Sequence, residues 1–132
     1  MNYLLDTHTL IWAVTDPRQL SPSATELITD GRHDIVVSVV SFWEIALKHG
    51  LQKLTLAGLT PADFPQAALD TGFRLLELDA QTTATYYQLT ATYHKDPFDR
   101  MLIWQALCQD YALISCDENV AKYTSEGLRV IW

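Results

Sequence analysis

The alternation of short apolar runs with longer amphipathic segments constrains the fold of this chain more than any other feature. Apolar runs rich in leucine and β-branched residues occupy residues 3–5, 35–40, 75–78, 111–115 and 129–132. Runs of this length predict strands, and the run at 35–40 is apolar on both faces, as in a strand inside a parallel sheet. Strands that alternate with helices predict βαβ crossovers and a mostly parallel sheet with helices on both faces.

Helix start signals separate the predicted strands. Serine, threonine or aspartate followed by proline opens three of the expected helices, and proline is favoured in a first turn. The expected helices span residues 7–14, 21–31, 42–49, 60–72, 79–93, 98–110 and 117–123. Ser41 is the expected N-cap of the helix at 42–49. Trp43, Ala46 and Leu47 share one face of that helix, which predicts that this face packs on the core.

The size and composition of the chain predict one globular unit. With 132 residues, of which 48% are apolar, we expect a single domain over 1–132 with a sizeable core. No apolar run approaches the roughly 18–20 residues needed to cross a bilayer. Residues 1–6 lack the basic and apolar regions of a signal peptide. We therefore expect a soluble, cytoplasmic protein without a membrane segment.

The charge and the cysteines restrict the function classes. A formal net charge of −7 argues against capture of nucleic acid by a broad basic face. It is compatible with a nuclease, because an enzyme with a nest of carboxylates is acidic until its metal ions are counted. Two cysteines, Cys108 and Cys116, form neither a disulfide framework nor a zinc site of familiar spacing. We expect both to be reduced, partly buried thiols.

Four acidic residues follow predicted strands or open predicted helices. Asp6 comes directly after the first strand, and Asp117 follows the fourth. Glu44 and Asp99 lie in the first turns of the helices that follow the second strand and the Asp-Pro pair at 96–97. A parallel sheet collects such positions beyond the carboxyl ends of its strands, so we expect the four carboxylates to meet at one edge.

Each acid also has a purely structural interpretation. Asp6, Asp96 and Asp117 are suitable N-caps, because the helix dipole favours negative charge at its amino end. Glu44 is spaced to pair with Lys48 on a helix surface, a contact worth about 0.2–0.5 kcal/mol. Under this interpretation the chain is a non-catalytic binding module.

Taken together, the four carboxylates favour a metal site. Two unit charges about 4 Å apart repel by about 4 kcal/mol at an effective dielectric of roughly 20, so a fold that gathers them needs a cation or protons. Hard oxygen ligands select Mg²⁺ or Mn²⁺ over zinc, and phosphodiester hydrolysis is the chemistry natural to such a site. A haloacid-type phosphatase would require a second aspartate two residues after Asp6, where this chain has His8.

Four sequence blocks resemble the PIN-domain family, and specifically the ribonuclease toxins of VapBC-type toxin–antitoxin pairs. The blocks are YLLDTH at 3–8, SFWEIALK at 41–48, HKDPFDRMLI at 94–103 and LISCDEN at 113–119. They occur in the family's order and span nearly the whole chain. The first block alone is weakly specific, whereas the second and third together are strongly specific.

The resemblance implies a three-layer α/β/α sandwich and an endoribonuclease that depends on Mg²⁺ or Mn²⁺. Asp6, Glu44, Asp99 and Asp117 fall on the family's acidic positions. The resemblance favours Asp6 and Asp99 as direct metal ligands, with Asp117 binding directly or through water. Glu44 would position water or complete the ligand set, whereas Asp96 would remain structural.

The resemblance also extends to neighbouring residues and to partners. Ser41, Ser115 and Asn119 would hydrogen-bond to the acidic ligands, and Arg100 would contact phosphate or pair with a carboxylate. Of the histidines, only His8 lies next to a predicted ligand in sequence, but a position outside the site is favoured for it, and the others are expected at the surface. The family further implies an RNA substrate, a homodimer and a cognate VapB-like antitoxin. A PIN-fold nuclease of RNA maturation is the remaining enzymatic alternative.

Overall fold

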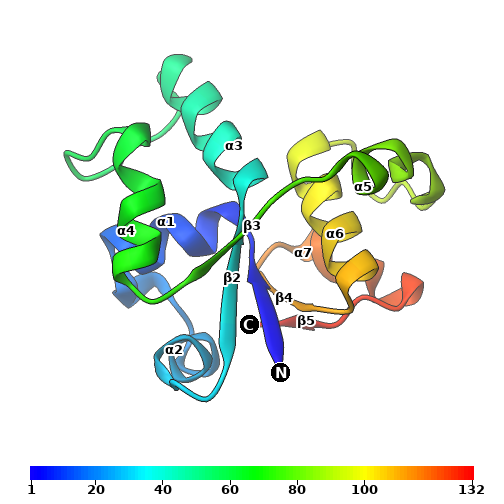
Figure 1. The fold of residues 1–132 in the computed structure, drawn as a ribbon, viewed down its shortest axis with the longest axis horizontal. Coiled ribbons are helices and arrows are strands. Elements are labelled where there is room, and N and C mark those ends of the chain that lie inside the picture. The colour runs from blue at the N-terminus through cyan, green and yellow to red at the C-terminus, as the bar shows by residue number, and fades with distance from the viewer.

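A parallel sheet of five strands forms the centre of the computed structural model, which describes residues 1–132 (Figure 1). The strands lie in the order β3-β2-β1-β4-β5, and every neighbouring pair is parallel. Their bounds are β1 (Asn2–Leu5), β2 (Asp34–Ser38), β3 (Arg74–Leu76), β4 (Ala112–Ile114) and β5 (Val130–Ile131). Because the strands all run the same way, their carboxyl ends share one edge of the sheet, toward the top of Figure 1.

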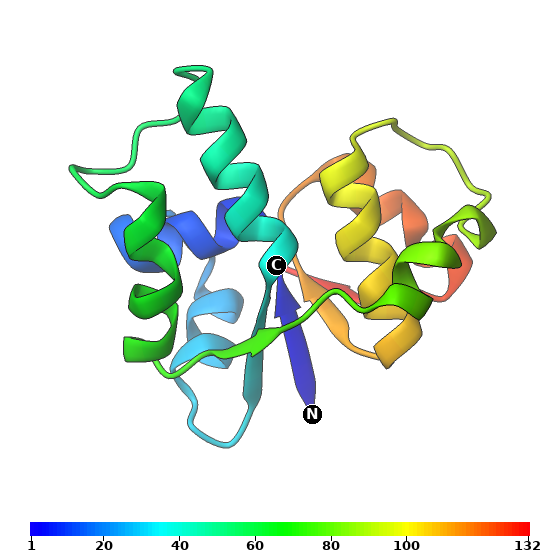
Figure 2. The same cartoon turned by 45° about the horizontal axis from the view of Figure 1, so that its top comes forward.

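Helices cover both faces of this sheet and complete three layers. The α-helices are α1 (Thr7–Thr15), α2 (Pro22–Thr29), α3 (Val39–Gly50), α4 (Phe64–Asp70), α5 (Ala80–Ala84), α6 (Pro97–Gln109) and α7 (Glu118–Ala121). The short 3-10 helices are η1 (Pro17–Gln19), η2 (Pro61–Asp63), η3 (Tyr86–Gln88) and η4 (Lys122–Glu126). Helices α1–α4 lie on one side of the sheet and α5–α7 on the other (Figures 1 and 2). The predicted α/β class with a parallel sheet between helical layers is confirmed.

Alternate residues of the strands supply two separate cores. On β1, Tyr3 and Leu5 pack with the layer of α1–α4, and Leu4 packs with the layer of α6 and α7. Leu4 and Leu5 are both completely buried, as expected for a strand covered on both faces. Full burial of a leucine side chain stabilises the fold by about 1.5–3 kcal/mol. The central strand is therefore held firmly, and polar groups at its carboxyl end have a rigid support.

The second strand is shorter than predicted, because the helix after it begins early. β2 ends at Ser38, whose hydroxyl accepts a hydrogen bond from the backbone N–H of Val40 at 3.1 Å and caps α3. A strand through residue 40 and an N-cap at Ser41 are therefore wrong. Ser41 lies buried in the first turn of α3 and accepts a hydrogen bond from the Thr7 hydroxyl at 3.0 Å. Val40 is buried within the helix, and this tertiary packing overrides the strand preference of valine.

The inward face of α3 also differs from the prediction. Trp43 is 62% exposed and Leu47 is 40% exposed, whereas Ser41, Glu44 and Ile45 are buried. The apolar pattern predicted the wrong inward face, because the face that packs inward includes two polar side chains, Ser41 and Glu44. Since α3 begins at residue 39, Glu44 lies in its second turn and not in the first.

The helix expected over 79–93 is much shorter than predicted. α5 ends at Ala84, η3 ends at Gln88, and residues 89–96 form neither helix nor strand. Within α5 the Thr83 hydroxyl donates to the carbonyl oxygen of Asp79 at 2.8 Å, and such side-chain bonds to the backbone weaken a regular helix. The irregular segment leads directly into α6 and contributes to the site described below.

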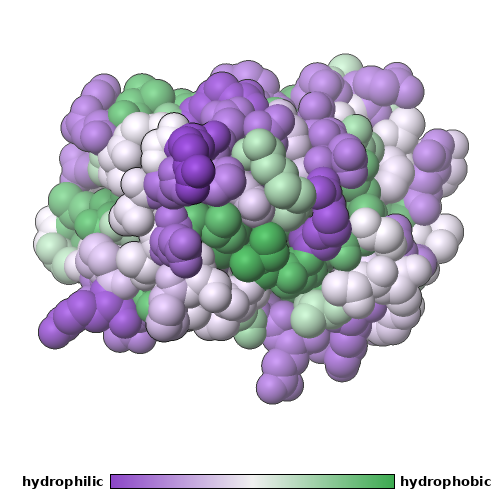
Figure 3. Space-filling view, turned by 90° about the horizontal axis from the view of Figure 1, so that it is seen from below, coloured by the Kyte–Doolittle hydropathy of each residue, from purple (hydrophilic) through white to green (hydrophobic).

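The surface holds both cysteines and an apolar patch. Cys108 and Cys116 are free and exposed, so the expectation of partly buried thiols is wrong. They lie on a helix and in a loop, at positions that face away from the core. Figure 3 views the molecule from below Figure 1 and shows apolar side chains near the centre of this face, bordered by hydrophilic ones. None of the helices combines the length and the apolar composition needed to cross a membrane.

Candidate functional site

Asp6 joins the end of β1 to the start of α1. Its backbone N–H donates to the carbonyl oxygen of Ile114 at 3.2 Å, and its Oδ1 accepts from the N–H of Thr9 at 2.8 Å as the N-cap of α1. Burial raises the pKa of the Asp6 carboxyl, although hydrogen bonds from Ser115 and Thr9 oppose the shift. Asp6 is therefore a helix cap and, at the same time, a carboxylate withdrawn from water at the sheet edge.

Asp117 occupies the equivalent place after β4. Its Oδ1 accepts from the backbone N–H of Asn119 at 2.7 Å and caps α7. Its own N–H donates to the hydroxyl oxygen of Ser115 at 3.1 Å, so buried Ser115 contacts both Asp6 and Asp117. The side-chain oxygen of Asn119 accepts from Lys122 at 3.2 Å. Asn119 thus supports the acid through its backbone.

The start of α6 brings two further acids to the site. Asp96 caps α6, because its Oδ1 accepts from the N–H groups of Phe98 at 2.9 Å and Asp99 at 3.1 Å. Carboxylate oxygens of Glu44, Asp96 and Asp99 all lie within 4.8 Å of one another. The predicted cap at Asp96 is present, but the view of Asp96 as structural alone is incomplete, since it also joins the acidic group.

The pKa of Asp99 reflects the charges of the other acids around it. Burial, and then the charges of Asp96, Glu44, Asp6 and Asp117 in that order, together raise the pKa of Asp99 to about 7. Of the four acids predicted from the sequence, Glu44 and Asp99 therefore lie together with Asp96, and Asp6 and Asp117 lie near enough for their charges to act on Asp99. We call Asp6, Glu44, Asp96, Asp99 and Asp117 the acidic edge.

Glu44 is the most deeply buried acid of this group. The residue is 2% exposed, and its Oε2 forms an ion pair with Nζ of Lys48, one helical turn away. The expected i, i+4 pair is therefore present, but it lies inside the site and not on a free surface. The same Nζ lies 4.0 Å from Oδ2 of Asp96. Glu44 Oε1 is buried without a hydrogen-bond partner, so one oxygen of this carboxylate is left for a ligand.

His94 is a site residue that sequence reasoning missed. Its Nε2 lies 3.6 Å from Oδ2 of Asp99, and its side chain is only 12% exposed. Its Nδ1 lies 3.1 Å from the hydroxyl oxygen of Tyr123. The expectation that His94 is a surface residue is wrong, whereas His8 is exposed, in line with the favoured position outside the site. The available signal was the position of His94 at the head of the HKDPFDR block.

Arg100 follows Asp99 in sequence but turns into the protein. The residue is 8% exposed and forms no ion pair with a carboxylate. Its Nε donates to the Tyr86 hydroxyl and its Nη1 donates to the Tyr123 hydroxyl, both at 2.8 Å. Two backbone carbonyls also accept from the guanidinium group: Ala91 O from Nη1 at 2.5 Å, and Leu89 O from Nη2 at 2.8 Å. We call this group the arginine cluster. In this arrangement Arg100 fixes the segment before α6, and it makes no carboxylate pair of the kind that the sequence left open.

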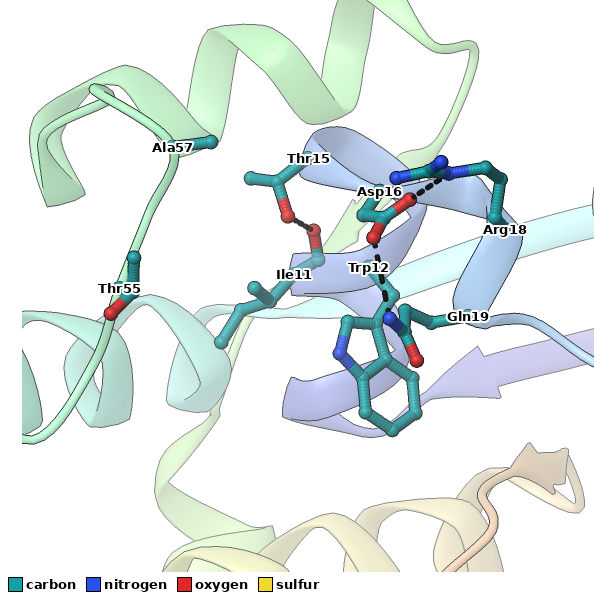
Figure 4. Close-up of a pocket in the computed structure, with 8 residues that line it drawn as sticks. All are labelled: Ile11, Trp12, Thr15, Asp16, Arg18, Gln19, Thr55 and Ala57. Carbon is teal, nitrogen blue, oxygen red and sulfur yellow. Dashed lines mark hydrogen bonds and ion pairs between the residues drawn. The ribbon is translucent and has the colours of Figure 1, made fainter.

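Two hollows lie outside the acidic edge. The larger, of about 330 Å³, lies at the other end of α1 from Asp6, and there Asp16 is hydrogen-bonded by Arg18 and Gln19 (Figure 4). The smaller, of about 150 Å³, is apolar and includes Trp43 and Phe98, which flank the acids in sequence. In the larger hollow Asp16 is already paired with Arg18, and neither hollow gathers several carboxylates as the acidic edge does.

The donor set of the acidic edge fits a hard divalent cation. It offers carboxylate oxygens from three neighbouring residues and a buried, unpartnered oxygen on Glu44. Oxygen ligands of this kind suit Mg²⁺ or Mn²⁺, whereas zinc prefers cysteine and histidine. The mutual repulsion that raises the pKa of Asp99 is relieved either by a proton or by such a cation.

A model of the family described as the PIN domain matches residues 3–125. The chain belongs to the PIN-domain family. It is 23% identical over 129 residues to Ribonuclease VapC22 of Mycobacterium tuberculosis, an alignment that covers 98% of this chain and 97% of that one. This PIN domain thus resembles that relative over its full length.

Solved structures support the fold of this PIN domain. The structure of VapBC2 from Rickettsia felis bound to a promoter DNA fragment matches with a TM-score of 0.65 and 16% identity, over 99% of this chain and 98% of that one. FitAcB from Neisseria gonorrhoeae matches with a TM-score of 0.61 and 19% identity, over 98% and 96%. These likenesses extend across all three layers, so the α/β/α sandwich is shared with both.

Proposed function

We propose that this PIN domain is a metal-dependent endoribonuclease that hydrolyses RNA phosphodiester bonds with Mg²⁺ or Mn²⁺. The observation that carries the proposal is the cluster of Glu44, Asp96 and Asp99, whose carboxylate oxygens lie within 4.8 Å of one another; burial and four other acids raise the pKa of Asp99 to about 7. Membership of the PIN-domain family and the likeness to a relative named as a ribonuclease support it.

In this proposal Asp6 and Asp99 bind the cation directly, with Glu44 and Asp117 completing or orienting the set. When bound, Mg²⁺ or Mn²⁺ would lower the pKa of a water molecule and neutralise charge on the phosphate. The protein's own part is to hold the carboxylates in place. Asp6, Asp96 and Asp117 each use Oδ1 as a helix cap, which fixes the orientation of the carboxylate. Capping and ligand binding are therefore compatible roles of the same side chain.

Of the predicted supporting residues, Ser115 and Asn119 contact the acids, whereas Ser41 contacts Thr7. Buried Ser115 contacts Asp6 and Asp117, and buried Ser41 accepts from Thr7 beside the start of α1. Asn119 donates its backbone N–H to Asp117 at 2.7 Å. Such contacts around the ligands are what makes a metal site precise.

We further propose that the chain is the toxin of a toxin–antitoxin pair, acts as a homodimer in the cytoplasm and binds a VapB-like antitoxin. The likeness to structures of VapBC and toxin–antitoxin complexes favours this role. The acidic edge suits an arginine from a partner, because guanidinium groups pair well with carboxylates. A PIN nuclease of RNA maturation is the alternative, and a neighbouring gene for a small DNA-binding protein separates the two.

The decisive experiment is cleavage of RNA by the purified protein with Mg²⁺ or Mn²⁺, with and without EDTA. Asp6→Asn and Asp99→Asn should each lower the rate at least about a hundredfold, since each removes a ligand charge. Asp79→Asn is the matched control, because Asp79 is also an N-cap but does not belong to the acidic edge. Intact RNA with both ions, or cleavage by Asp6→Asn at the wild-type rate, would refute the proposal.

Expression in a bacterial host tests the toxin role separately. The wild-type chain should arrest growth, and co-expression of the protein encoded by a neighbouring antitoxin gene should restore it. Growth unaffected by an active nuclease would favour the RNA-maturation alternative.

A further inference from the structure

A chain of polar contacts leads from the arginine cluster to Asp99. Arg100 Nη1 donates to the Tyr123 hydroxyl at 2.8 Å, the same hydroxyl lies 3.1 Å from His94 Nδ1, and His94 Nε2 lies 3.6 Å from Asp99 Oδ2. Tyr123 is completely buried and Arg100 nearly so. The contact between Arg100 and Tyr123 therefore lies inside the protein, and the His94 and Asp99 side chains are 12% and 19% exposed.

The donors and acceptors fix the direction of this chain. A guanidinium group has no acceptor, so the oxygen of Tyr123 must accept from Arg100. The single hydroxyl proton of Tyr123 is then free to be donated to His94 Nδ1. With Nδ1 acting as an acceptor, the proton of the neutral imidazole is carried by Nε2, the nitrogen that faces Asp99.

His94 Nε2 has no other partner to satisfy it. It is buried and makes no hydrogen bond, and Asp99 Oδ2 is the carboxylate oxygen beside it. An N–H···O bond closes at about 2.7–3.2 Å, so a small rotation of the Asp99 carboxylate completes the contact. Arg100 has no acidic partner of its own, and its remaining donors hold the backbone at Leu89 and Ala91. The cluster thus anchors the segment that carries His94.

We propose that His94 is a positioning residue for Asp99, held as the Nε2–H tautomer by Tyr123 and Arg100, and that it donates to Oδ2 and so determines which oxygen of Asp99 is presented to the cation. This inference rests on the proposed metal-dependent function of the acidic edge. It assigns a purpose to the histidine at the head of the HKDPFDR block and to the buried arginine behind it.

The tautomer of His94 can be measured without any RNA. In the metal-free protein labelled with ¹⁵N-histidine, long-range ¹H–¹⁵N spectra at a pH where the imidazoles are neutral distinguish protonated from unprotonated ring nitrogens. His94→Gln identifies the His94 signals by their loss. We expect Nε2 to be protonated in the wild type, and Tyr123→Phe to produce a mixture of tautomers.

Tyr93→Phe is the matched control for this experiment. Tyr93 packs edge-on against Tyr123, and its hydroxyl contacts Ser125 at 2.7 Å and not His94. The same loss of a hydroxyl next to Tyr123 should therefore leave the His94 spectrum unchanged. A ring protonated on Nδ1, a doubly protonated ring, or a spectrum unaffected by Tyr123→Phe would overturn the proposal.

Mn²⁺ binding, followed by electron paramagnetic resonance of the free ion, tests the effect on the ligand. His94→Leu should weaken binding about tenfold to a hundredfold, as is typical when a group that orients a ligand is lost. His94→Gln, whose amide can donate from a position close to Nε2, should recover most of the affinity, and Tyr93→Phe should bind as wild type. Equal Mn²⁺ affinity of His94→Leu and wild type would refute the role.

The two proposals fail in different ways. If the proposed nuclease function is wrong, the wild type cleaves no RNA, but the His94 variants still change Mn²⁺ affinity. If the role of His94 is wrong, RNA cleavage still depends on Asp6 and Asp99, while the His94 tautomer and Mn²⁺ affinity show none of the expected changes. Thermal unfolding of each variant separates both results from a loss of folded protein.

Discussion

Asp99 and Arg100 are neighbours on α6, yet Asp99 lies among like charges and Arg100 lies among neutral hydrogen-bond acceptors. Asp99 faces four other acids, and its pKa rises to about 7 through burial and their repulsion. Arg100 is buried among two tyrosine hydroxyls and two backbone carbonyls, all of them neutral. The acidic edge keeps excess negative charge, whereas the arginine cluster spreads its positive charge over fixed dipoles.

This separation leaves the carboxylates of the acidic edge without Arg100 as a partner. If Arg100 turned toward Asp99, an internal ion pair would satisfy the acidic edge without a metal. Four hydrogen bonds from Arg100 instead hold the Tyr86 and Tyr123 hydroxyls and two backbone carbonyls of the irregular segment in place. The arginine cluster therefore supplies rigidity, and the acidic edge supplies the unbalanced charge that a ligand can neutralise.

Replacement of the buried guanidinium group of Arg100 should have the largest effect on the free energy of unfolding. Arg100→Leu leaves two hydroxyls and two carbonyls without their donor, and we expect the free energy of unfolding to fall by about 3–5 kcal/mol in urea denaturation. Arg129→Leu is the control, because exposed Arg129 donates to Asp110 at the surface, and its effect should stay below about 0.5 kcal/mol. An Arg100→Leu protein as stable as wild type would show that the cluster does not depend on its cation.

The pH dependence of stability should reveal the acidic edge. The pKa of Asp99 is raised from 3.8 in the unfolded chain to about 7 in the folded one, so its stabilising protonated form is fully present below pH 4 and is lost as pH rises to 7. Asp6 acts in the same direction. Each pKa unit is worth roughly 1.4 kcal/mol, and after discount for solvent screening we expect a loss of about 2–3 kcal/mol in metal-free protein.

Urea titrations at about pH 5 and pH 8, in EDTA and in excess Mn²⁺, check this sign. Manganese should remove most of the loss at the higher pH, because it neutralises the same charges. The carboxyls whose pKa is lowered by hydrogen bonds, Asp16, Asp30 and Asp79, act below pH 4 and in the opposite direction. Stability that rises between pH 5 and 8 in EDTA would contradict the repulsion inferred for Asp99.

Neutralisation of Asp99 should stabilise the metal-free protein. Asp99→Asn removes one of the repelling charges, and we expect the free energy of unfolding at about pH 8 to rise by about 1–2 kcal/mol. The same variant should lose its stabilisation by Mn²⁺. Asp70→Asn is a suitable control, since Asp70 is exposed and accepts only from Gln66. A less stable Asp99→Asn protein would mean that the carboxylate is already compensated without metal.

The fold was predictable because its signals are local. Apolar runs and Ser-Pro, Thr-Pro or Asp-Pro pairs mark strands and helix starts directly, and four acids lie beside those marks. The start of α3 was harder, because the choice between Ser38 and Ser41 as the cap depends on burial of Val40. That shift of three residues also decides which side chains face inward.

The polar surroundings of the site depend on contacts between distant segments. His94 meets Asp99 only because residues 89–96 are not helical, and their path is held by Arg100 and Tyr123. A periodic pattern carries no information about such a path. The partly missed residues, His94 and Asp96, are therefore those whose role depends on the arginine cluster and on the approach of α3 to α6.

Replacement of Lys48 should have the smallest effect on stability, and it tests whether the acidic edge also contains a positive charge that it depends on. Lys48 is the basic group that pairs with acids of the acidic edge. Lys48→Gln leaves Glu44 without its ion pair, so metal-free protein should lose about 1 kcal/mol of stability, a modest cost because Lys48 is partly exposed. The freed oxygen should bind Mn²⁺ severalfold more tightly, since lysine no longer competes for it. Lys53→Gln, at an exposed position without an ion pair, should change neither quantity. Weaker Mn²⁺ binding by Lys48→Gln would instead mean that Lys48 orients Glu44 for the cation, and that the acidic edge, like the arginine cluster, depends on a built-in positive charge.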